Sequence, residues 1–130
     1  MNEGRTVVST SAAPAAIGPY SQAIVAGNLV FCSGQIPLSP ETGQIVGAGD
    51  IAAQTEQVMK NLSAVLTAAG CGFEHVVRCT IYLASMSDFA TVNGIYGRFF
   101  PSNPPARTTI QAAGLPRGAL VEIDAIAVRS

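Results

Sequence analysis

Three ionisable side chains in the last quarter of the sequence have the chemistry of a small polar site. Arg107 lies in residues 104–111, and Glu122 and Asp124 lie in residues 120–128. Both segments mix β-branched residues with period-2 alternation and are bounded by Pro or Gly, which predicts two β-strands. The planar guanidinium of an arginine can bind a carboxylate through two parallel hydrogen bonds. Charges on a largely apolar strand face require a protein partner or a ligand.

The segment between these strands predicts how they pair. Residues 113–118 contain two glycines and a proline, so we expect a turn and an antiparallel pairing of the two strands. A hairpin folded symmetrically about this turn would place Arg107 near Asp124 and Thr109 near Glu122. The arrangement leaves two interpretations open, a structural ion pair or a binding site for a carboxylate ligand.

The rest of the chain predicts the elements that must position these residues. A Gly27-Asn28 turn separates two apolar runs and predicts a hairpin. A helix is expected over residues 50–69, with Asp50 as its N-cap and Gly70 just after its end. A second helix is expected over residues 87–100, where Gly94 and Gly97 cost about 1 kcal/mol each relative to alanine. Strands are expected at residues 5–9, 21–26, 29–33 and 75–83.

This order of elements predicts a single α+β domain over residues 1–130, with both helices on one face of a mixed sheet. The expected core faces are Val77, Cys79, Ile81 and Leu83 from one strand, and Val121, Ile123, Ala125 and Ala127 from another. The opposite sheet face is also apolar, so we expect it to pack against copies of itself in a closed ring.

Composition supports self-association and excludes several classes of function. Hydrophobic residues make up 48% of the 130 residues and charged residues only 12%, against about 25% charged residues in an average protein. A net charge of −1 without a basic run argues against nucleic-acid binding. His75 is the only histidine, which excludes a multi-histidine metal site. Three cysteines without CxxC spacing, no apolar leader and no apolar run of membrane length predict a cytoplasmic protein that does not enter a membrane.

Five motifs together resemble the RidA (reactive intermediate deaminase, YjgF) family. The resemblance covers nearly the whole chain, with the motifs in the family's order. They are Gly18-Pro19-Tyr20-Ser21-Gln22, Cys32-Ser33-Gly34-Gln35-Ile36-Pro37, Asp88-Phe89-Ala90-Thr91-Val92-Asn93, Pro105-Ala106-Arg107 and residues 121–127 (VEIDAIA).

The resemblance implies a fold, an assembly and a reaction. The fold is chorismate-mutase-like, and the assembly is a homotrimer with its sites between subunits. The reaction is hydrolysis of 2-imino acids and their enamine tautomers, such as 2-iminobutanoate and 2-iminopropanoate. These compounds leak from pyridoxal-phosphate enzymes, and hydrolysis gives a 2-keto acid and ammonia. Neither a metal nor a cofactor is implied.

The resemblance also implies roles for individual residues. Arg107 would bind the substrate carboxylate with help from the backbone N–H of Gly34, and Glu122 would orient and activate water. Asp124 would be structural. Tyr20, Ser33 and Asn93 match positions that line the cleft.

One position departs from the family pattern. Many members carry cysteine two residues after the arginine, and here the residue is Thr109. A thiol nucleophile is therefore absent from that position, although the backbone carbonyl of Thr109 could still contact the imine nitrogen. We expect the three cysteines present to be buried apolar residues.

Three other functions compete with deamination. A protein of the same fold could bind 2-keto acids through Arg107 as a sensor, without turnover. An endoribonuclease would need a basic groove and an acid–base pair, which this composition does not favour. A chaperone-like role is compatible with the apolar composition but has no motif of its own.

Overall fold

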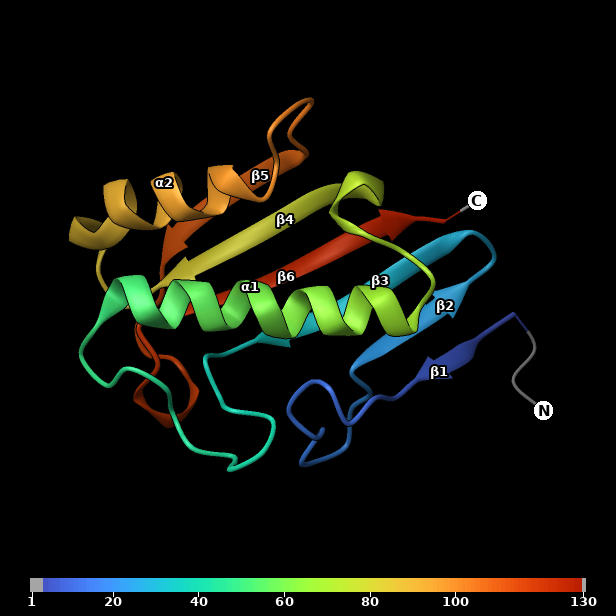
Figure 1. Cartoon of the computed structure of the whole chain (residues 1–130), viewed down its shortest axis with the longest axis horizontal. Coiled ribbons are helices and arrows are strands. Elements are labelled where there is room, and N and C mark those ends of the chain that lie inside the picture. Colours follow the sequence, from blue (N-terminus) through green and yellow to red (C-terminus); the bar gives the residue numbers. More distant parts are fainter. Residues whose placement is uncertain (1–3, 130) are drawn as a thin grey trace.

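A six-stranded mixed sheet forms the body of the chain, and both helices pack on the same face of it (Figure 1). The computed structural model describes residues 4–129, so the ends of the expected domain, residues 1–3 and 130, lie outside the described residues. The strands are β1 (Thr6–Val8), β2 (Ala23–Ala26), β3 (Leu29–Gln35), β4 (Val76–Leu83), β5 (Ala106–Gln111) and β6 (Val121–Val128). The helices are α1 (Ile51–Ala68) and α2 (Phe89–Arg98).

The sheet order is β1-β2-β3-β6-β4-β5, so the predicted hairpin of β5 and β6 is wrong. β4 lies between these two strands, pairing in parallel with β5 and antiparallel with β6. The physical reason is the β4–α2–β5 connection. A strand, a crossover helix and a second strand form a βαβ unit, which pairs its strands in parallel. β6 then enters the centre of the sheet, between β3 and β4.

This topology separates the residues that the hairpin would have joined. Arg107 and Ala125 both align with Cys79, so Arg107 points to the helix side of the sheet. Glu122 aligns with Tyr82 and points to the opposite, open side. Arg107 is therefore near neither Asp124 nor Glu122 in one chain, and that expectation is also wrong.

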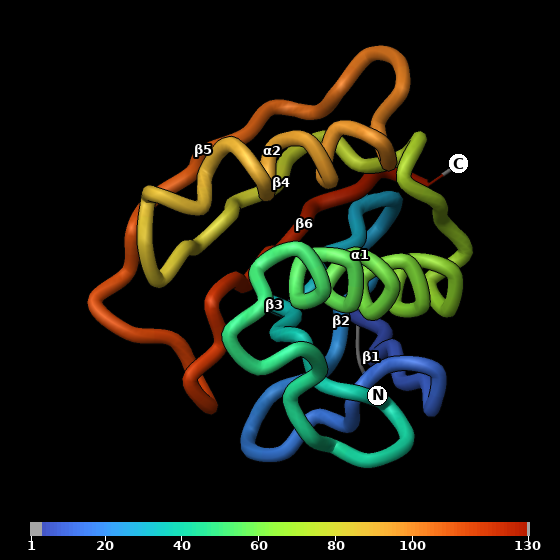
Figure 2. Tube along the Cα trace, turned by 60° about the vertical axis from the view of Figure 1, so that its left-hand side comes forward, coloured from blue at the N-terminus to red at the C-terminus, as the bar shows by residue number. Residues whose placement is uncertain are grey.

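Helix α1 begins and ends as its sequence predicts. The Asp50 side chain accepts a hydrogen bond from the Ala53 N–H at 3.1 Å. At the other end, Gly70 has a φ of 82°, and the Cys71 N–H donates to the Leu66 carbonyl, as in a Schellman motif. The helix packs across β6 and β3, while α2 lies toward β4 and β5 (Figures 1 and 2).

The expected core face of β6 is confirmed, because Val121, Ile123, Ala125 and Ala127 are all buried. The expected face of β4 is wrong at one position. A β-bulge between Val76 and Arg78 buries Val76 and leaves Val77 45% exposed, while Cys79, Ile81 and Leu83 face the core as predicted.

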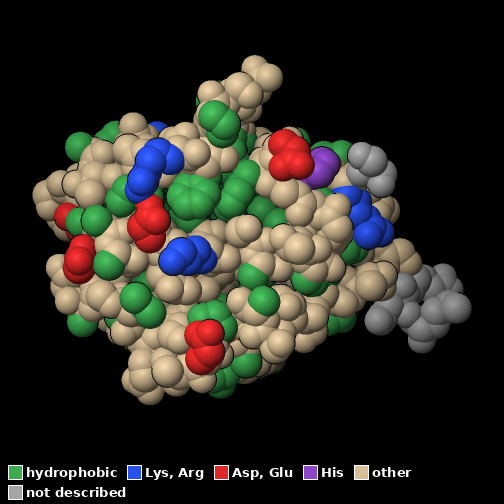
Figure 3. Space-filling model, viewed as in Figure 1, with side chains coloured by type: hydrophobic (Ala, Val, Ile, Leu, Met, Phe, Trp, Pro, Cys, Tyr) green, Lys and Arg blue, Asp and Glu red, His purple; other side chains and the backbone are tan. Residues whose placement is uncertain are grey.

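Helix α2 is shorter than the predicted 87–100 segment. Residues Met86–Asp88 form a separate 3-10 turn, and Phe99 caps the helix C-terminus. Phe73 packs against Phe99 and Phe100, with ring centroids 5.4 and 5.3 Å away. Figure 3 shows hydrophobic side chains gathered between α1 and α2 on this face.

The open face of the sheet carries exposed apolar residues. Val7, Phe31 and Ile110 are 51%, 42% and 44% exposed on strands β1, β3 and β5. Within residues 4–129, neither helix has the length and apolarity needed to cross a bilayer.

Candidate active site

A cavity of about 600 Å³ lies beside Glu122, and we call it the Glu122 cavity. It is bordered by the segment before β2, by the end of β3, and by the turn that precedes β6. Four of the seven predicted site residues line it: Tyr20, Ser33, Gly34 and Glu122. Arg117 lies at the same cavity and donates a hydrogen bond to the Gly43 carbonyl at 3.2 Å.

Gly34 allows the Glu122 carboxylate to lie close to the β3 backbone. A Cβ built on Gly34 would collide with Oε2 of Glu122. The register of β3 against β6 is irregular between Cys32 and Gln35, which places Gly34 in this distorted region. Ser33 is fixed beside it, because its hydroxyl donates to the Ser21 carbonyl at 2.6 Å and its N–H donates to the Gln22 carbonyl at 2.9 Å.

The surroundings of Glu122 favour its protonated form. Burial raises the pKa of the Glu122 carboxyl above its usual 4.5, and the negative charge of Asp124 raises it further. Asp124 itself is held on the open face of the sheet. It accepts hydrogen bonds from the Thr80 N–H at 3.1 Å and the Tyr82 hydroxyl at 3.2 Å.

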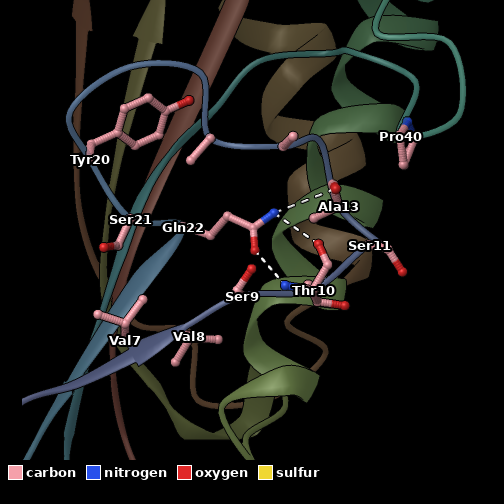
Figure 4. Close-up of a pocket in the computed structure, with 12 residues that line it drawn as sticks. Val7, Val8, Ser9, Thr10, Ser11, Ala13, Tyr20, Ser21, Gln22 and Pro40 are labelled. Atoms are coloured by element: carbon pink, nitrogen blue, oxygen red, sulfur yellow. Dashed lines mark hydrogen bonds between the residues drawn. The ribbon is translucent and has the colours of Figure 1, made fainter.

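Gln22 organises the segment that carries Tyr20 (Figure 4). Its side chain is 4% exposed. Its Oε1 accepts from the Thr10 N–H at 2.7 Å, and its Nε2 donates to the carbonyls of Thr10 and Pro14 at 3.0 and 2.8 Å. A second cavity of about 480 Å³ adjoins this segment, and Tyr20 borders both cavities.

Two buried polar residues of α1 fix the loops around the Glu122 cavity. Asn61 donates to the carbonyls of Ile36 and Leu38 at 3.1 and 2.9 Å. Gln54 donates to the Gly47 carbonyl at 3.0 Å and accepts from the Leu120 N–H at 2.8 Å. Sequence reasoning missed these supporting roles. The available signal was two amide side chains seven residues apart, adjacent to the apolar stripe of a helix.

Arg107 lies at a different cavity of about 440 Å³, which we call the Arg107 cavity. Its Nη1 donates to Oδ1 of Asn93 at 2.6 Å. Its Cζ lies 5.6 Å from the ring centroid of Phe89 and 5.1 Å from that of Tyr96, within cation–π distance of both. Asn93 and Arg107 are thus the predicted site residues that the fold brings together on α2 and β5.

Thr109 shares the helix-side face of β5 with Arg107. Its hydroxyl oxygen is buried and has no hydrogen-bond partner among residues 4–129. β5 is an edge strand of the sheet, so one side of its backbone is not paired within the sheet.

The two cavities share no lining residue, and they divide six of the seven predicted site residues between them, since Thr109 lines neither cavity. An internal ion pair does not account for Arg107. Within the described residues, the salt bridges join His75 to Glu74 and Arg98 to Glu56. The guanidinium of Arg107 is held by an amide and two aromatic rings, and none of these neutralises its charge.

The three cysteines are buried free thiols. Burial raises the pKa of Cys32 to about 12 and also raises the pKa of Cys71 and Cys79. The expectation that these residues are buried is confirmed.

Comparison with known proteins places this fold and its residues in one family. The chain superposes on a Thermotoga maritima protein described as a putative endoribonuclease, with a TM-score of 0.93 and 49% identity over 96% of this chain and 98% of that one. It also superposes on Escherichia coli TdcF with bound serine, with a TM-score of 0.91 and 40% identity over 96% and 99% of the two chains.

Sequence comparison agrees with the structural matches. The family model described as Endoribonuclease L-PSP matches residues 10–129. The protein DfrA of Myxococcus xanthus is 58% identical over 126 residues, covering 95% of each chain. The mouse 2-iminobutanoate/2-iminopropanoate deaminase is 51% identical over 125 residues, covering 96% of this chain and 92% of the mouse protein. The chain therefore belongs to the RidA (YjgF) family, as the motifs predict.

Proposed function

We propose that this protein hydrolyses 2-imino acids, among them 2-iminobutanoate and 2-iminopropanoate, to 2-keto acids and ammonia. The observation that carries the proposal is the 51% identity, over nearly the full length, to the mouse protein that bears this activity in its name. The arrangement of charged groups is compatible with it, because the reaction needs a cation for the carboxylate and a base for water.

Arg107 is the proposed carboxylate-binding residue. A guanidinium has five N–H donors, and the described residues accept one hydrogen bond from that of Arg107, at Asn93 Oδ1. Its remaining donors can form the bidentate pair that a planar carboxylate prefers. The backbone N–H of Gly34 is the proposed second donor to the same carboxylate.

Glu122 is the proposed base. Its carboxylate takes a proton from a water molecule while the water oxygen bonds to the imine carbon, and the C=N double bond becomes a single bond. Glu122 returns this proton to the nitrogen. It then takes the proton of the new hydroxyl group as the C=O bond forms and the C–N bond breaks, and the leaving ammonia carries that proton away as ammonium. A protonated imine is already electrophilic, so positioned water and one carboxylate are sufficient for these steps.

The two groups of residues must come from different subunits for this mechanism to work. The Arg107 cavity and the Glu122 cavity are separate in one chain. We propose a homotrimer in which Arg107, Asn93 and Thr109 of one subunit face Tyr20, Ser33, Gly34 and Glu122 of the next. The apolar residues on the open sheet face support such an assembly, because their burial between subunits is favourable.

A carboxylate-binding protein without turnover is the second candidate. The observation that favours it is the TdcF structure, which is described with bound serine, an amino acid carboxylate. Glu122→Gln separates the two functions, because it removes the base and leaves Arg107 unchanged. The endoribonuclease named in the family model's description receives little support here, since the net charge is −1 and the sequence has one histidine.

A coupled assay tests the proposal. Threonine dehydratase is run with and without the protein, and the conversion of imine to 2-oxobutanoate is followed. We expect acceleration by the wild type, little acceleration by Arg107→Ala, and loss of acceleration with retained 2-oxobutanoate binding for Glu122→Gln. A wild type that binds 2-oxobutanoate without accelerating hydrolysis supports the binding protein instead.

A further inference from the structure

We infer that one face of α2 positions Arg107 for substrate, through a cradle formed by Phe89, Asn93 and Tyr96. This inference rests on the proposed function, because it concerns the residue that binds the substrate carboxylate. Neither aromatic residue was among the predicted site residues. We assign both as positioning residues, which act through Arg107.

The cradle follows from helical spacing. Residues 89, 93 and 96 stand at positions i, i+4 and i+7, which share one face of a helix. The βαβ connection places this helix over the sheet on the side to which Arg107 points. Two ring centroids at 5.6 and 5.1 Å and one amide oxygen at 2.6 Å then surround a single guanidinium.

The chemistry of the cradle suits a ligand-binding arginine. An arginine side chain loses considerable rotamer entropy when it is fixed in place. A carboxylate neighbour would fix it but would also compete with the substrate for the same donors. Aromatic faces and a neutral amide hold the cation without neutralising it. The cradle thus fixes the guanidinium while its charge stays available to an anion.

The ring of Tyr96, rather than its hydroxyl, makes this contact. Tyr96 is 3% exposed, and its hydroxyl lies near the Cys79 thiol but meets no partner among residues 4–129 with the geometry of a hydrogen bond. Tyr96→Phe keeps this ring and should therefore preserve its contact with the guanidinium. A purely structural role for these residues makes a different prediction, because Tyr96 also packs against Phe100, with ring centroids 4.8 Å apart. In that case substitutions would lower stability without changing substrate binding.

Phe89 gives the sharpest test, because it is only half-buried and so less important for folding. We expect Phe89→Leu to raise KM for the imino acid about two- to fivefold, the range for an exposed cation–π contact, with a smaller change in kcat. Phe89→Tyr, which keeps a ring, should restore the wild-type KM. Phe73→Leu is the matched control, since Phe73 is also half-buried but packs against Phe99 and Phe100. It should leave KM unchanged.

Two further measurements separate positioning from folding. In an Arg107→Ala background, Phe89→Leu should cause no further loss of affinity for 2-oxobutanoate. In the wild type, the NMR signal of the Arg107 Hε should be shifted upfield by the ring currents, and Phe89→Leu should reduce this shift. An unchanged KM in Phe89→Leu, an equal KM increase in Phe73→Leu, or a wild-type Hε signal without a ring-current shift overturns the cradle.

Failure of the proposed function is a distinct result. A wild type that does not hydrolyse imino acids overturns the deaminase proposal. The Hε shift and the affinity for 2-oxobutanoate then test the cradle without an activity assay. Phe89→Leu should lower this affinity about two- to fivefold. Unchanged affinity in that variant overturns the cradle.

Discussion

The pKa of Glu122 determines how the proposed reaction should depend on pH. Burial and the charge of Asp124 both raise this pKa above 4.5. Because the base acts when it is deprotonated, kcat/KM should rise with pH through this raised value. Asp124→Asn removes the nearby charge and should move the rise to lower pH. A pH profile of kcat/KM for both proteins tests this, and coincident profiles would contradict it.

The raised pKa of Glu122 also makes the free energy of unfolding depend on pH. This contribution falls as pH rises, whereas the proposed activity increases. Between the unfolded and folded pKa values of Glu122, the folded state binds more protons than the unfolded state. The contribution of Glu122 to stability is therefore complete below the unfolded pKa and is lost as pH rises through the folded pKa. It is the active, deprotonated form that the fold stabilises less.

Gly34 should be essential for activity and of little importance for folding. In Gly34→Ala the new Cβ displaces the Glu122 carboxylate, which is the end of a flexible side chain. We expect kcat to fall at least tenfold, since general-base catalysis contributes about 10²–10⁴-fold, with little change in the unfolding midpoint. Gly114→Ala is the control, because a Cβ there has nothing within 4 Å. Equal kcat values for the two variants would show that the close approach of Glu122 is unimportant.

At the scale of elements, Gln22 connects β2 to the segment that carries Tyr20. Gln22→Ala leaves the Thr10 N–H and the carbonyls of Thr10, Ala13 and Pro14 without this partner. We expect a loss of about 1–3 kcal/mol in the free energy of unfolding, together with a higher KM as Tyr20 loses its fixed position. Chemical denaturation and steady-state kinetics measure these effects. A loss of stability with an unchanged KM would show that fixing this segment does not contribute to substrate binding.

Elements defined by neighbouring residues could be predicted from the sequence. The N-cap at Asp50, the Schellman glycine at Gly70 and the turn at Gly27 each depend on interactions within a few residues. The bulge at Val77 could not be predicted, because Val76 and Val77 are equally apolar and the alternation does not show which is buried.

Strand order was mispredicted because it depends on a choice between distant partners. The turn before β6 favoured pairing with β5, but α2 between β4 and β5 favoured a parallel pair, and the latter arrangement formed. The residue types of the site could be predicted from the motifs. The division of these residues between two cavities depends on the strand order, so it could not be predicted from the sequence.

At the scale of the whole molecule, Arg107 and Glu122 lie at different cavities of one chain, so a complete site would form only in the proposed assembly. Arg107→Ala and Glu122→Gln should each be inactive alone. Refolded together from denaturant, they form hybrid trimers with one interface that carries both wild-type residues. In an equal random mixture, about a quarter of the sites are intact, so about a quarter of wild-type activity should return.

Mixing the two variants without denaturation is the control, because activity should then return only as fast as subunits exchange between the proposed trimers. If co-refolding restores no activity while sedimentation shows trimers, Arg107 and Glu122 do not share a site across the interface. Co-refolding Arg107→Ala with itself should likewise remain inactive.

The burial of the three thiols has a consequence for the proposed reaction. The C=N carbon of a 2-imino acid is electrophilic, so an exposed thiolate could add to it in place of water. Cys32, Cys71 and Cys79 are 6%, 8% and 0% exposed, and each has a raised pKa. Position 109 is threonine, so no thiol lies two residues after the arginine. If the protein is the proposed deaminase, its buried thiols would therefore compete little with water for the imine carbon.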